Sequence, residues 1–198
     1  MILNLPQPKM LYLSNVVSDA LLAMVGLGVY FRYFSRISLY NRLLWGTFLI
    51  VISMDAAVGA CRFAGVGWLV PLHQSLQSMV SSIGIVSAVV AVWALVNQHV
   101  ISHQIWITTL GIGIGLFALL MFTFLSGFTL VVQSLGMLAI MLIAVYGLAR
   151  GYRKATWIIV GIMIAGIATK MPTQNWLNAT DFYHYSLAAM LICFGKAV

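Results

Sequence analysis

The strongest constraint on this chain is a long stretch without formal charge, because residues 63–149 contain no Lys, Arg, Asp or Glu. A soluble domain needs far more polar side chains to cover its surface, whereas roughly 20 apolar residues let one helix cross a bilayer. The whole 198-residue chain has the same character, with 63% hydrophobic and 7% charged residues. We therefore predict an integral membrane protein, with residues 1–198 forming a single all-α transmembrane domain.

Apolar runs separated by short polar segments predict seven transmembrane helices. Their expected ranges are 10–31, 43–62, 73–96, 105–125, 128–148, 155–171 and 179–195. The first run is long enough to span a bilayer, so we interpret it as a helix and not as a cleavable signal peptide. We expect Pro172 to end the sixth helix and Lys170 to extend its amine toward the membrane surface.

The distribution of basic residues predicts the orientation of the bundle. If the N-terminus lies outside, seven of the 10 Lys and Arg residues face the cytoplasm and three face outward. Basic loops favour the cytoplasmic side, so we predict an outside N-terminus and an inside C-terminus in the cell inner (plasma) membrane. The inner set is Arg32, Arg36, Arg42, Arg150, Arg153, Lys154 and Lys196, and the outer set is Lys9, Arg62 and Lys170. Membrane lipids are then the expected partners, and the net charge of +7 does not indicate nucleic acid.

Pairs of small residues four positions apart predict where helices pack closely. Gly111 and Gly115 form such a pair in the fourth predicted helix, and Gly161 and Ala165 form one in the sixth. Small side chains let two helix backbones approach each other in a membrane.

The three acidic residues of the chain are the main functional clue. Asp19, Asp55 and Asp181 all lie within or at the edge of predicted helices. A carboxylate at the centre of a membrane helix costs about 2.5–3.5 kcal/mol, so it is usually paired or faces a polar cavity. The predicted topology places these acids in the outer half of the bilayer, on the side where His73 and His184 begin their helices. We therefore predict a polar pocket that opens outward.

Helical spacing suggests a role for each polar residue near this pocket. Asn15 with Asp19, and His73 with Gln77, are i,i+4 pairs that share a helix face. We predict catalytic roles for Asp19 and Asp55, substrate binding by Arg62, Gln77 and Asn15, and metal ligation by His73, His184 and Asp181. The alternatives are structural: Arg62 can pair with an acid, and Asp181 can complement the dipole of its helix behind an Asn178 cap.

Residues near both ends of the chain resemble a known superfamily. The segment Asp181-Phe182-Tyr183-His184, together with Ser18-Asp19 and Asp55, resembles the CREST superfamily of seven-helix membrane proteins. That superfamily includes alkaline ceramidases and the progestin and adipoQ receptors, and the similarity is greater to an uncharacterised bacterial branch of like length. The resemblance implies a zinc site, with one histidine from an early helix and two from the last, that activates water to hydrolyse a lipid amide.

The sequence matches that zinc pattern only in part. His184 corresponds to one histidine of the last helix, and His73 lies near the early one. Ala188 occupies the position of the second histidine, and Leu69 stands where the pattern has a serine. A zinc site would then need an aspartate, from Asp19, Asp55 or Asp181, as its third ligand.

Three functions are consistent with these residues. The first is a metal-dependent hydrolase of a lipid or lipid-like amide. The second is a non-enzymatic sensor, a solute-binding protein or an accessory subunit of a membrane protein complex. The third is a membrane cytochrome in which His73 and His184 ligate one haem.

Overall fold

A computed structural model describes residues 9–122, 125–169 and 178–198. Within these ranges the chain is all-helical, with seven continuous helices and no strand. Five of them are single α-helices: α2 (Leu39–Phe63), α5 (His103–Leu120), α6 (Thr129–Ala149), α7 (Ala155–Ala168) and α8 (Ala179–Lys196). The first helix, Lys9–Phe34, consists of α1 (Lys9–Val29) followed by a π-helical turn. The third helix, Gly67–Val96, consists of a 3-10 turn, α3 (Val70–Met79), a π-helical turn (Val80–Gly84) and α4 (Ile85–Val96).

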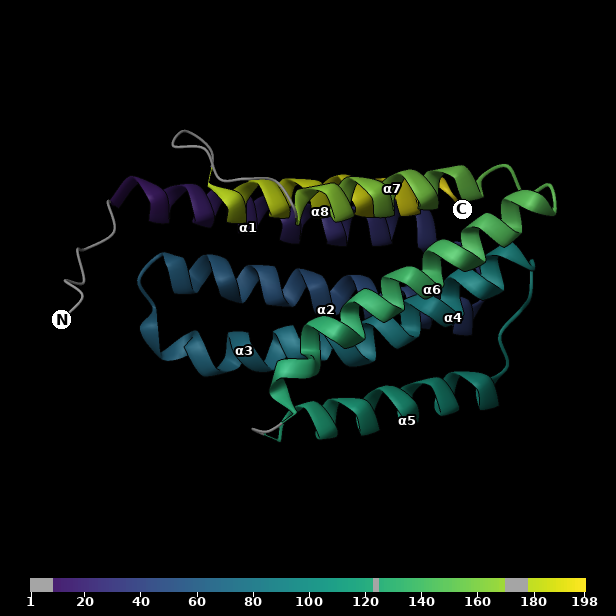
Figure 1. The fold of residues 1–198 in the computed structure, drawn as a ribbon, viewed down its shortest axis with the longest axis horizontal. Helices are drawn as coiled ribbons and strands as arrows, with labels where there is room; N and C mark the ends of the chain where they lie inside the picture. The colour runs from purple at the N-terminus through teal and green to yellow at the C-terminus, as the bar shows by residue number, and fades with distance from the viewer. Residues whose placement is uncertain (1–8, 123–124, 170–177) are drawn as a thin grey trace.

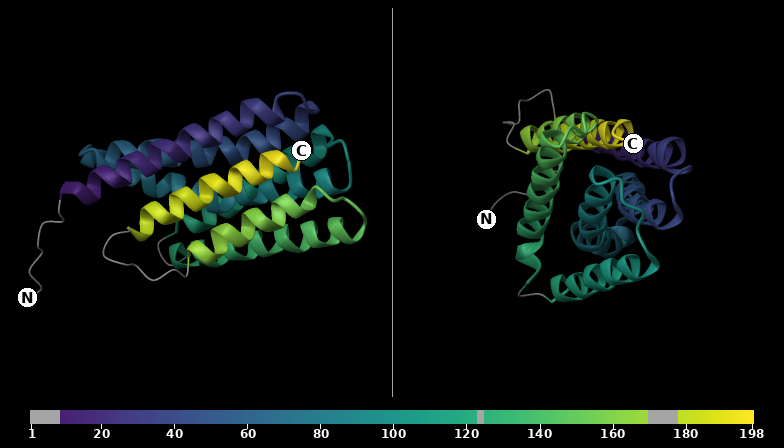
Figure 2. Two further views of the ribbon diagram at one scale, coloured as in Figure 1. Left: turned by 90° about the horizontal axis from the view of Figure 1, so that it is seen from above. Right: turned by 90° about the vertical axis from the view of Figure 1, so that its right-hand side faces the viewer.

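The helices form an up-and-down bundle with three levels (Figure 1). Helices α1, α8 and α7 lie side by side in one layer, α2 and the α3–α4 rod lie beneath them, and α5 lies on the far side. Helix α6 runs diagonally from the end of α5 to the α7 layer and packs on α4 (Figure 2). The ends of α2, α5 and α7 therefore meet the beginnings of α1, α3, α6 and α8 at one end of the bundle. We call this end the site end.

The membrane character of the chain follows from five of these helices. Leu13–Phe34, Leu39–Phe63, Gly67–Val96, His103–Leu120 and Thr129–Ala149 are each long and apolar enough to cross a bilayer. Many large apolar side chains on them point out of the bundle, including Met24, Ile112, Leu130 and Leu142. Such a surface suits lipid and not water. Helix α7 is apolar but shorter, with 14 residues, so the structure bears out a membrane bundle but not the seven-span count.

The predicted helix ranges are close to the observed ones, with one informative difference. The third helix begins at Gly67 and not at His73, so His73 lies about 9 Å inside the helix and not at its mouth. Pro71 occupies the first turn of α3, where a residue without an N–H is tolerated and its fixed φ suits a helix. The predictions for Lys170 and Pro172 lie outside the described residues.

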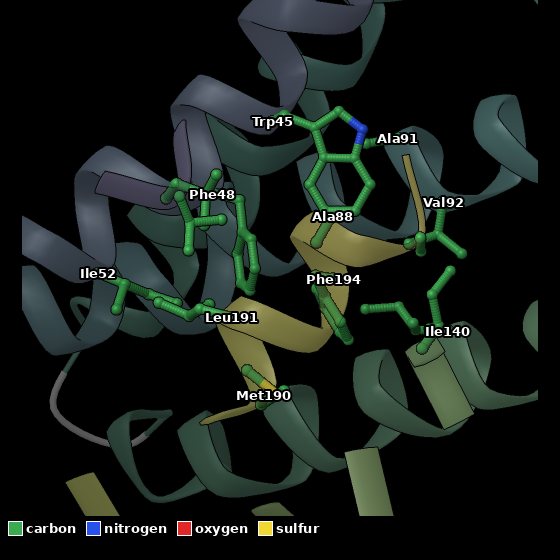
Figure 3. Close-up of a cluster of buried hydrophobic side chains, with 14 of the residues drawn as sticks. Trp45, Phe48, Ile52, Ala88, Ala91, Val92, Ile140, Met190, Leu191 and Phe194 are labelled. Carbon is green, nitrogen blue, oxygen red and sulfur yellow. The ribbon is translucent and has the colours of Figure 1, made fainter. Parts of the chain in front are cut away.

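The core lies in the middle of the bundle, where a few aromatic rings pack among many aliphatic side chains. Trp45 stacks on Phe34, with ring centroids 4.5 Å apart, and meets Phe194 edge-on at 6.0 Å. Phe48 stacks on the same Phe194 at 6.1 Å. Figure 3 shows Trp45, Phe48 and Phe194 packed with aliphatic side chains from α4, α6 and α8, including Ile140 and Met190. This apolar layer separates the site end from the opposite, arginine-rich end.

Side-chain contacts at the opposite end fix the axial position of α8. The Tyr152 hydroxyl donates to the carbonyl of Ala197 at 2.5 Å, and the Lys154 amine donates to that of Val198 at 2.7 Å. Lys196 also lies over the Trp157 ring, 4.5 Å from its centroid. Because a helix is stiff along its axis, these contacts also set the depth of the α8 residues at the site end.

Only one of the two predicted pairs of small residues lies at a close helix contact. A Cβ placed on Gly161 would lie 3.1 Å from Cys193 Cβ and 3.2 Å from the Met190 carbonyl, so α7 and α8 are in close contact there. Gly111 and Gly115 instead face open space, and the prediction for them is wrong. The glycine of α5 that packs is Gly113, whose added Cβ would lie 2.9 Å from the Cα of Ile83. Spacing alone does not tell which side of α5 meets its neighbour.

We predict opposite outcomes for two substitutions two residues apart on α5. Gly113→Leu forces α5 away from the Ile83 backbone and should lower the free energy of unfolding by about 1–3 kcal/mol. Gly111→Leu, with no atom nearby, should change it little. Reversible unfolding in mixed detergent micelles measures both. Equal effects of the two variants would contradict the described packing of α5.

Candidate functional site

Two aspartate–histidine pairs lie at the site end of the bundle. Asp19 of α1 contacts His184 of α8, with Oδ1 and Nδ1 2.8 Å apart. Asp55 of α2 contacts His73 of α3, with Oδ1 and Nδ1 3.1 Å apart. Asp19 is 1% exposed and His73 6% exposed. The buried Asp19 carboxyl and the partly buried Asp55 carboxyl therefore each have a polar partner on a different helix, which offsets part of the cost of removing them from water.

Gly59 of α2 lies where the two pairs meet. A Cβ at this position would lie 2.6 Å from Asp19 Oδ2 and 3.1 Å from His73 Cε1. Any side chain here would push Asp19 and His73 outward, so the close approach of α1 and α3 to α2 requires a glycine. The two pairs are thus neighbours, although their four members come from four helices.

Both pairs line one cavity of about 360 Å³. We call it the His–Asp cavity. Its volume falls in the range of small-molecule sites, roughly 300–1,000 Å³. None of the described residues that line it is a Lys or an Arg. Its polar lining consists of Asp19, Asp55, His73, Gln77, Ser81, Thr129, Gln133, Thr169, Tyr183 and His184, and its apolar lining includes Phe48, Ile52, Val80, Met137, Leu187 and Met190.

The two histidines differ in which ring nitrogens face polar neighbours. In His73 the second ring nitrogen is occupied, because Nε2 lies 3.0 Å from the Gln77 amide nitrogen, as the predicted i,i+4 pair implies. In His184 the polar contacts with other described residues are made by Nδ1, which faces Asp19 and also lies 3.4 Å from the Ser18 hydroxyl. A proton on Nδ1, directed at the Asp19 carboxyl, leaves Nε2 of His184 as a lone-pair nitrogen in a ring that lines the cavity.

Tyr183 and Gln133 form a third polar group in the cavity wall. The Gln133 amide donates to the Tyr183 hydroxyl at 3.3 Å. Because that hydroxyl accepts from Gln133, its own proton can be donated to a ligand. The sequence pattern suggests only an interfacial tyrosine at position 183, one residue before His184. The one local signal is the i,i+4 spacing of Tyr183 and Leu187 on α8, and both line the cavity.

Asp181 has a different environment from the other two acids. It is buried, and both Ser14 and Ser18 of α1 donate hydroxyl protons to its carboxyl, the Ser18 contact being 2.6 Å. It also lies in the first turn of α8, where a negative charge complements the helix dipole. Asp181 does not line the His–Asp cavity. Its contacts tie α1 to α8.

Asn15 and Asn178 strengthen the same link between α1 and α8. Asn178 caps α8, its side-chain oxygen accepting from the Thr180 N–H at 3.1 Å, as the sequence predicts. The Asn178 amide donates to the side-chain oxygen of Asn15 at 2.5 Å. Asn15 therefore contacts α8 and does not line the cavity.

Arg62 also lies away from the cavity. Its guanidinium stacks over the Phe63 ring, 5.1 Å from the centroid. The ion pairs found among the described residues join only Asp to His, so neither Asp55 nor Asp181 pairs with Arg62 there. Of the eight predicted site residues, the structure brings five to the cavity: Asp19, Asp55, His73, Gln77 and His184.

The predicted zinc ligands do not converge on one point. His73 faces Asp55, His184 faces Asp19, and Asp181 faces two serines. The residues described contain no group of three His, Cys, Asp or Glu side chains arranged to hold a metal ion. Each imidazole is oriented by a carboxyl, as metal-binding histidines commonly are, but the described residues place no third ligand beside the two histidines. The present donor set therefore does not fit zinc as placed.

We predict that Asp19 and His184 stabilise the fold as a unit. In a double-mutant cycle, Asp19→Ala and His184→Ala should show a coupling energy of about 0.5–3 kcal/mol in unfolding, because each removes the partner of a buried polar group. The control cycle pairs Asp19→Ala with His99→Ala at the opposite end of the bundle and should be additive within about 0.5 kcal/mol. Additivity in both cycles would show that the 2.8 Å contact does not contribute to stability.

Comparison with known proteins identifies the family but not an activity. No protein of curated function and no solved structure matches the chain, so the resemblance to the CREST superfamily stays a prediction. A family model described as a family of unknown function (DUF6962) matches residues 14–198, which include most of α1 and all of the later helices. The chain therefore belongs to this family.

Proposed function

We propose that this protein is a membrane hydrolase that cleaves an amide or ester of a lipid-like molecule in the His–Asp cavity. The observation that carries the proposal is the 2.8 Å contact between the Asp19 carboxyl and the His184 imidazole, because that imidazole lines a cavity of ligand size. A carboxyl that orients an imidazole through one ring nitrogen prepares the other nitrogen to act as a base.

The chemistry can be written with residues of the chain. Nε2 of His184 takes a proton from a water molecule, and the resulting hydroxide attacks the carbonyl carbon. Asp19 stabilises the imidazolium that forms. The Tyr183 hydroxyl, held by Gln133, donates a hydrogen bond to the carbonyl oxygen as it becomes negative. When the carbon–nitrogen or carbon–oxygen bond breaks, the leaving group takes the proton from His184, and a carboxylic acid remains.

The second pair lies beside the first in the lining of the cavity. Both ring nitrogens of His73 face polar neighbours, Nδ1 the Asp55 carboxyl and Nε2 the Gln77 amide, so His184 is the better candidate for the base. We assign His73 and Asp55 to the binding and positioning of the substrate, and Asp19 to the orientation of the base. A non-enzymatic solute-binding protein would use the same cavity but would release its ligand unchanged.

The hydrolase proposal predicts a specific order of effects on activity. With an N-acyl amide and a matching acyl ester, each carrying a fluorogenic leaving group, His184→Ala should lower kcat/KM by about 10²–10⁴-fold. Tyr183→Phe should lower kcat by roughly 10²-fold, because it removes one donor to the oxyanion. Arg62→Ala, which alters a residue outside the cavity, should retain the wild-type rate. Absence of turnover, or equal rates for wild type and His184→Ala, would overturn the proposal.

Metal content is measured on the same preparations. Zinc is the cofactor that the resemblance implies, so elemental analysis should compare the wild type with His184→Ala. One zinc per chain that is lost in the variant would support a metal-dependent version of the same hydrolysis, with cavity side chains moved from their described positions.

We further propose that the chain spans the cell inner (plasma) membrane seven times, with the site end outside. The acids and histidines of the site lie opposite the cluster of Arg32, Arg36, Arg150 and Arg153. Basic residues favour the cytoplasmic side. Helix α8 carries Asp181 and His184, but it packs between α1 and α7, so these polar groups need not contact lipid.

The orientation predicts which end of the bundle is labelled in intact cells. In a chain with both Cys61 and Cys193 replaced by Ser, Trp68→Cys at the site end should react with a membrane-impermeant maleimide from outside. Trp68 is 78% exposed, so the introduced thiol should be accessible. Arg36→Cys at the other end should react only after the cells are permeabilised. The reverse pattern would place the His–Asp cavity on the cytoplasmic side.

A further inference from the structure

A second cavity, of about 280 Å³, adjoins the His–Asp cavity. The two share part of their walls, including Gln133, Tyr183 and Leu187. The hydrogen bond from Gln133 to Tyr183 therefore lies where one space meets the other. Whatever occupies the second cavity is in contact with the wall of the first.

The second cavity has a regular construction. Helix α6 contributes residues at i, i+3, i+4 and i+7, and α7 contributes residues in the same series, so each helix presents one continuous face. We call this space the α6–α7 groove. The described lining is Leu130, Gln133, Ser134 and Met137 from α6, Ile162, Ala165 and Gly166 from α7 with its C-cap Thr169, and Tyr183 and Leu187 from α8.

The polarity of the α6–α7 groove changes along its length. Apart from the apolar Leu130, the lining toward the site end is polar, with Ser134, Thr169 and the Gln133–Tyr183 pair. Met137, Ile162 and Ala165 lie toward the middle of the bundle. From Thr169 to Ile162 the groove follows α7 for about 10 Å. The described residues of its lining carry no formal charge. A narrow apolar groove that begins beside a polar cavity matches a molecule with a polar end and an apolar tail.

We propose that the α6–α7 groove binds an unbranched hydrocarbon chain whose polar end lies in the His–Asp cavity, and that Gly166 sets the space available to that chain. The chemistry of the polar end rests on the proposed function, whereas the subsite for the hydrocarbon chain is inferred from the lining residues that the two cavities share. A Cβ placed on Gly166 meets no atom within 4 Å, so the space that a side chain would take is open. Gly166 is also exposed, so a chain can enter from the bilayer without passing through the core.

The test uses photoactivatable fatty acids with a diazirine at the chain end, in two or more chain lengths, and the full-length protein in lipid nanodiscs. Cross-linked peptides from wild type should map to α6 and α7, near Met137 and Ile162. Gly166→Leu should lower this labelling at least tenfold and shift the preference toward the shorter chain. Leu187→Ala, which enlarges the groove, should shift the preference toward the longer chain.

Gly111→Leu is the matched control, because Gly111 also faces open space but lies on α5, away from both cavities. It should label as the wild type does. Labelling spread evenly over α5 and α6, or equal labelling of wild type and Gly166→Leu, would identify ordinary bilayer contact and overturn the proposal. If Gly166→Leu were poorly folded, Leu187→Ala would still test the proposal, because its labelling should shift toward the longer fatty acid and an unchanged chain-length preference would overturn the proposal.

The outcome separates this inference from the proposed hydrolysis. Selective labelling of the groove without any turnover of amides or esters would keep the chain subsite and reject the hydrolase. Turnover that is the same for short and long acyl chains in wild type and in Gly166→Leu would keep the hydrolase and reject the subsite.

Discussion

The arrangement of this bundle depends on carboxyl groups that must be removed from water without being left alone. An isolated buried carboxylate costs several kcal/mol, far more than a single helix contact returns. Here each acid meets partners on another helix: Asp19 meets His184, Asp55 meets His73, and Asp181 meets two serines. These contacts join α1 to α8 and α2 to α3. They therefore determine which helix faces point inward at the site end, and with them the walls of the cavity.

The rest of the bundle supports this polar end in two ways. The aromatic layer around Trp45, Phe48 and Phe194 fills the middle and confines the polar groups to one end. The contacts of Tyr152 and Lys154 with the last carbonyls of α8 fix that helix along its axis. Because His184 lies on the same helix, its distance from Asp19 is set partly by residues at the far end. The core and the site are therefore mechanically connected through α8.

Glycines mark the places where helices approach most closely, and their positions separate local from tertiary information. Gly59 is required because Asp19 and His73 occupy the space of its missing side chain. Gly113 is required by the Ile83 backbone, whereas Gly111 on the same helix faces open space. All three look alike in the sequence. The difference between them is a property of neighbouring helices and not of local spacing, which is why the pattern at Gly111 and Gly115 is misleading.

The sequence by itself determined that this chain is a helical membrane protein, where most helices begin and end, and that its acids and two of its histidines gather at one end. Charge depletion and helical periodicity suffice for these conclusions, because the bilayer penalises charge and exposed backbone wherever they occur. Only the tertiary structure decided the pairing: His73 with Asp55, His184 with Asp19, and Asp181 with serines of α1 instead of a metal set. It also decided that Arg62 and Asn15 lie outside the cavity and that Tyr183 lies within its wall. Those facts depend on the rotation and depth of each helix against its neighbours, and helix packing sets these through contacts between residues far apart in the chain.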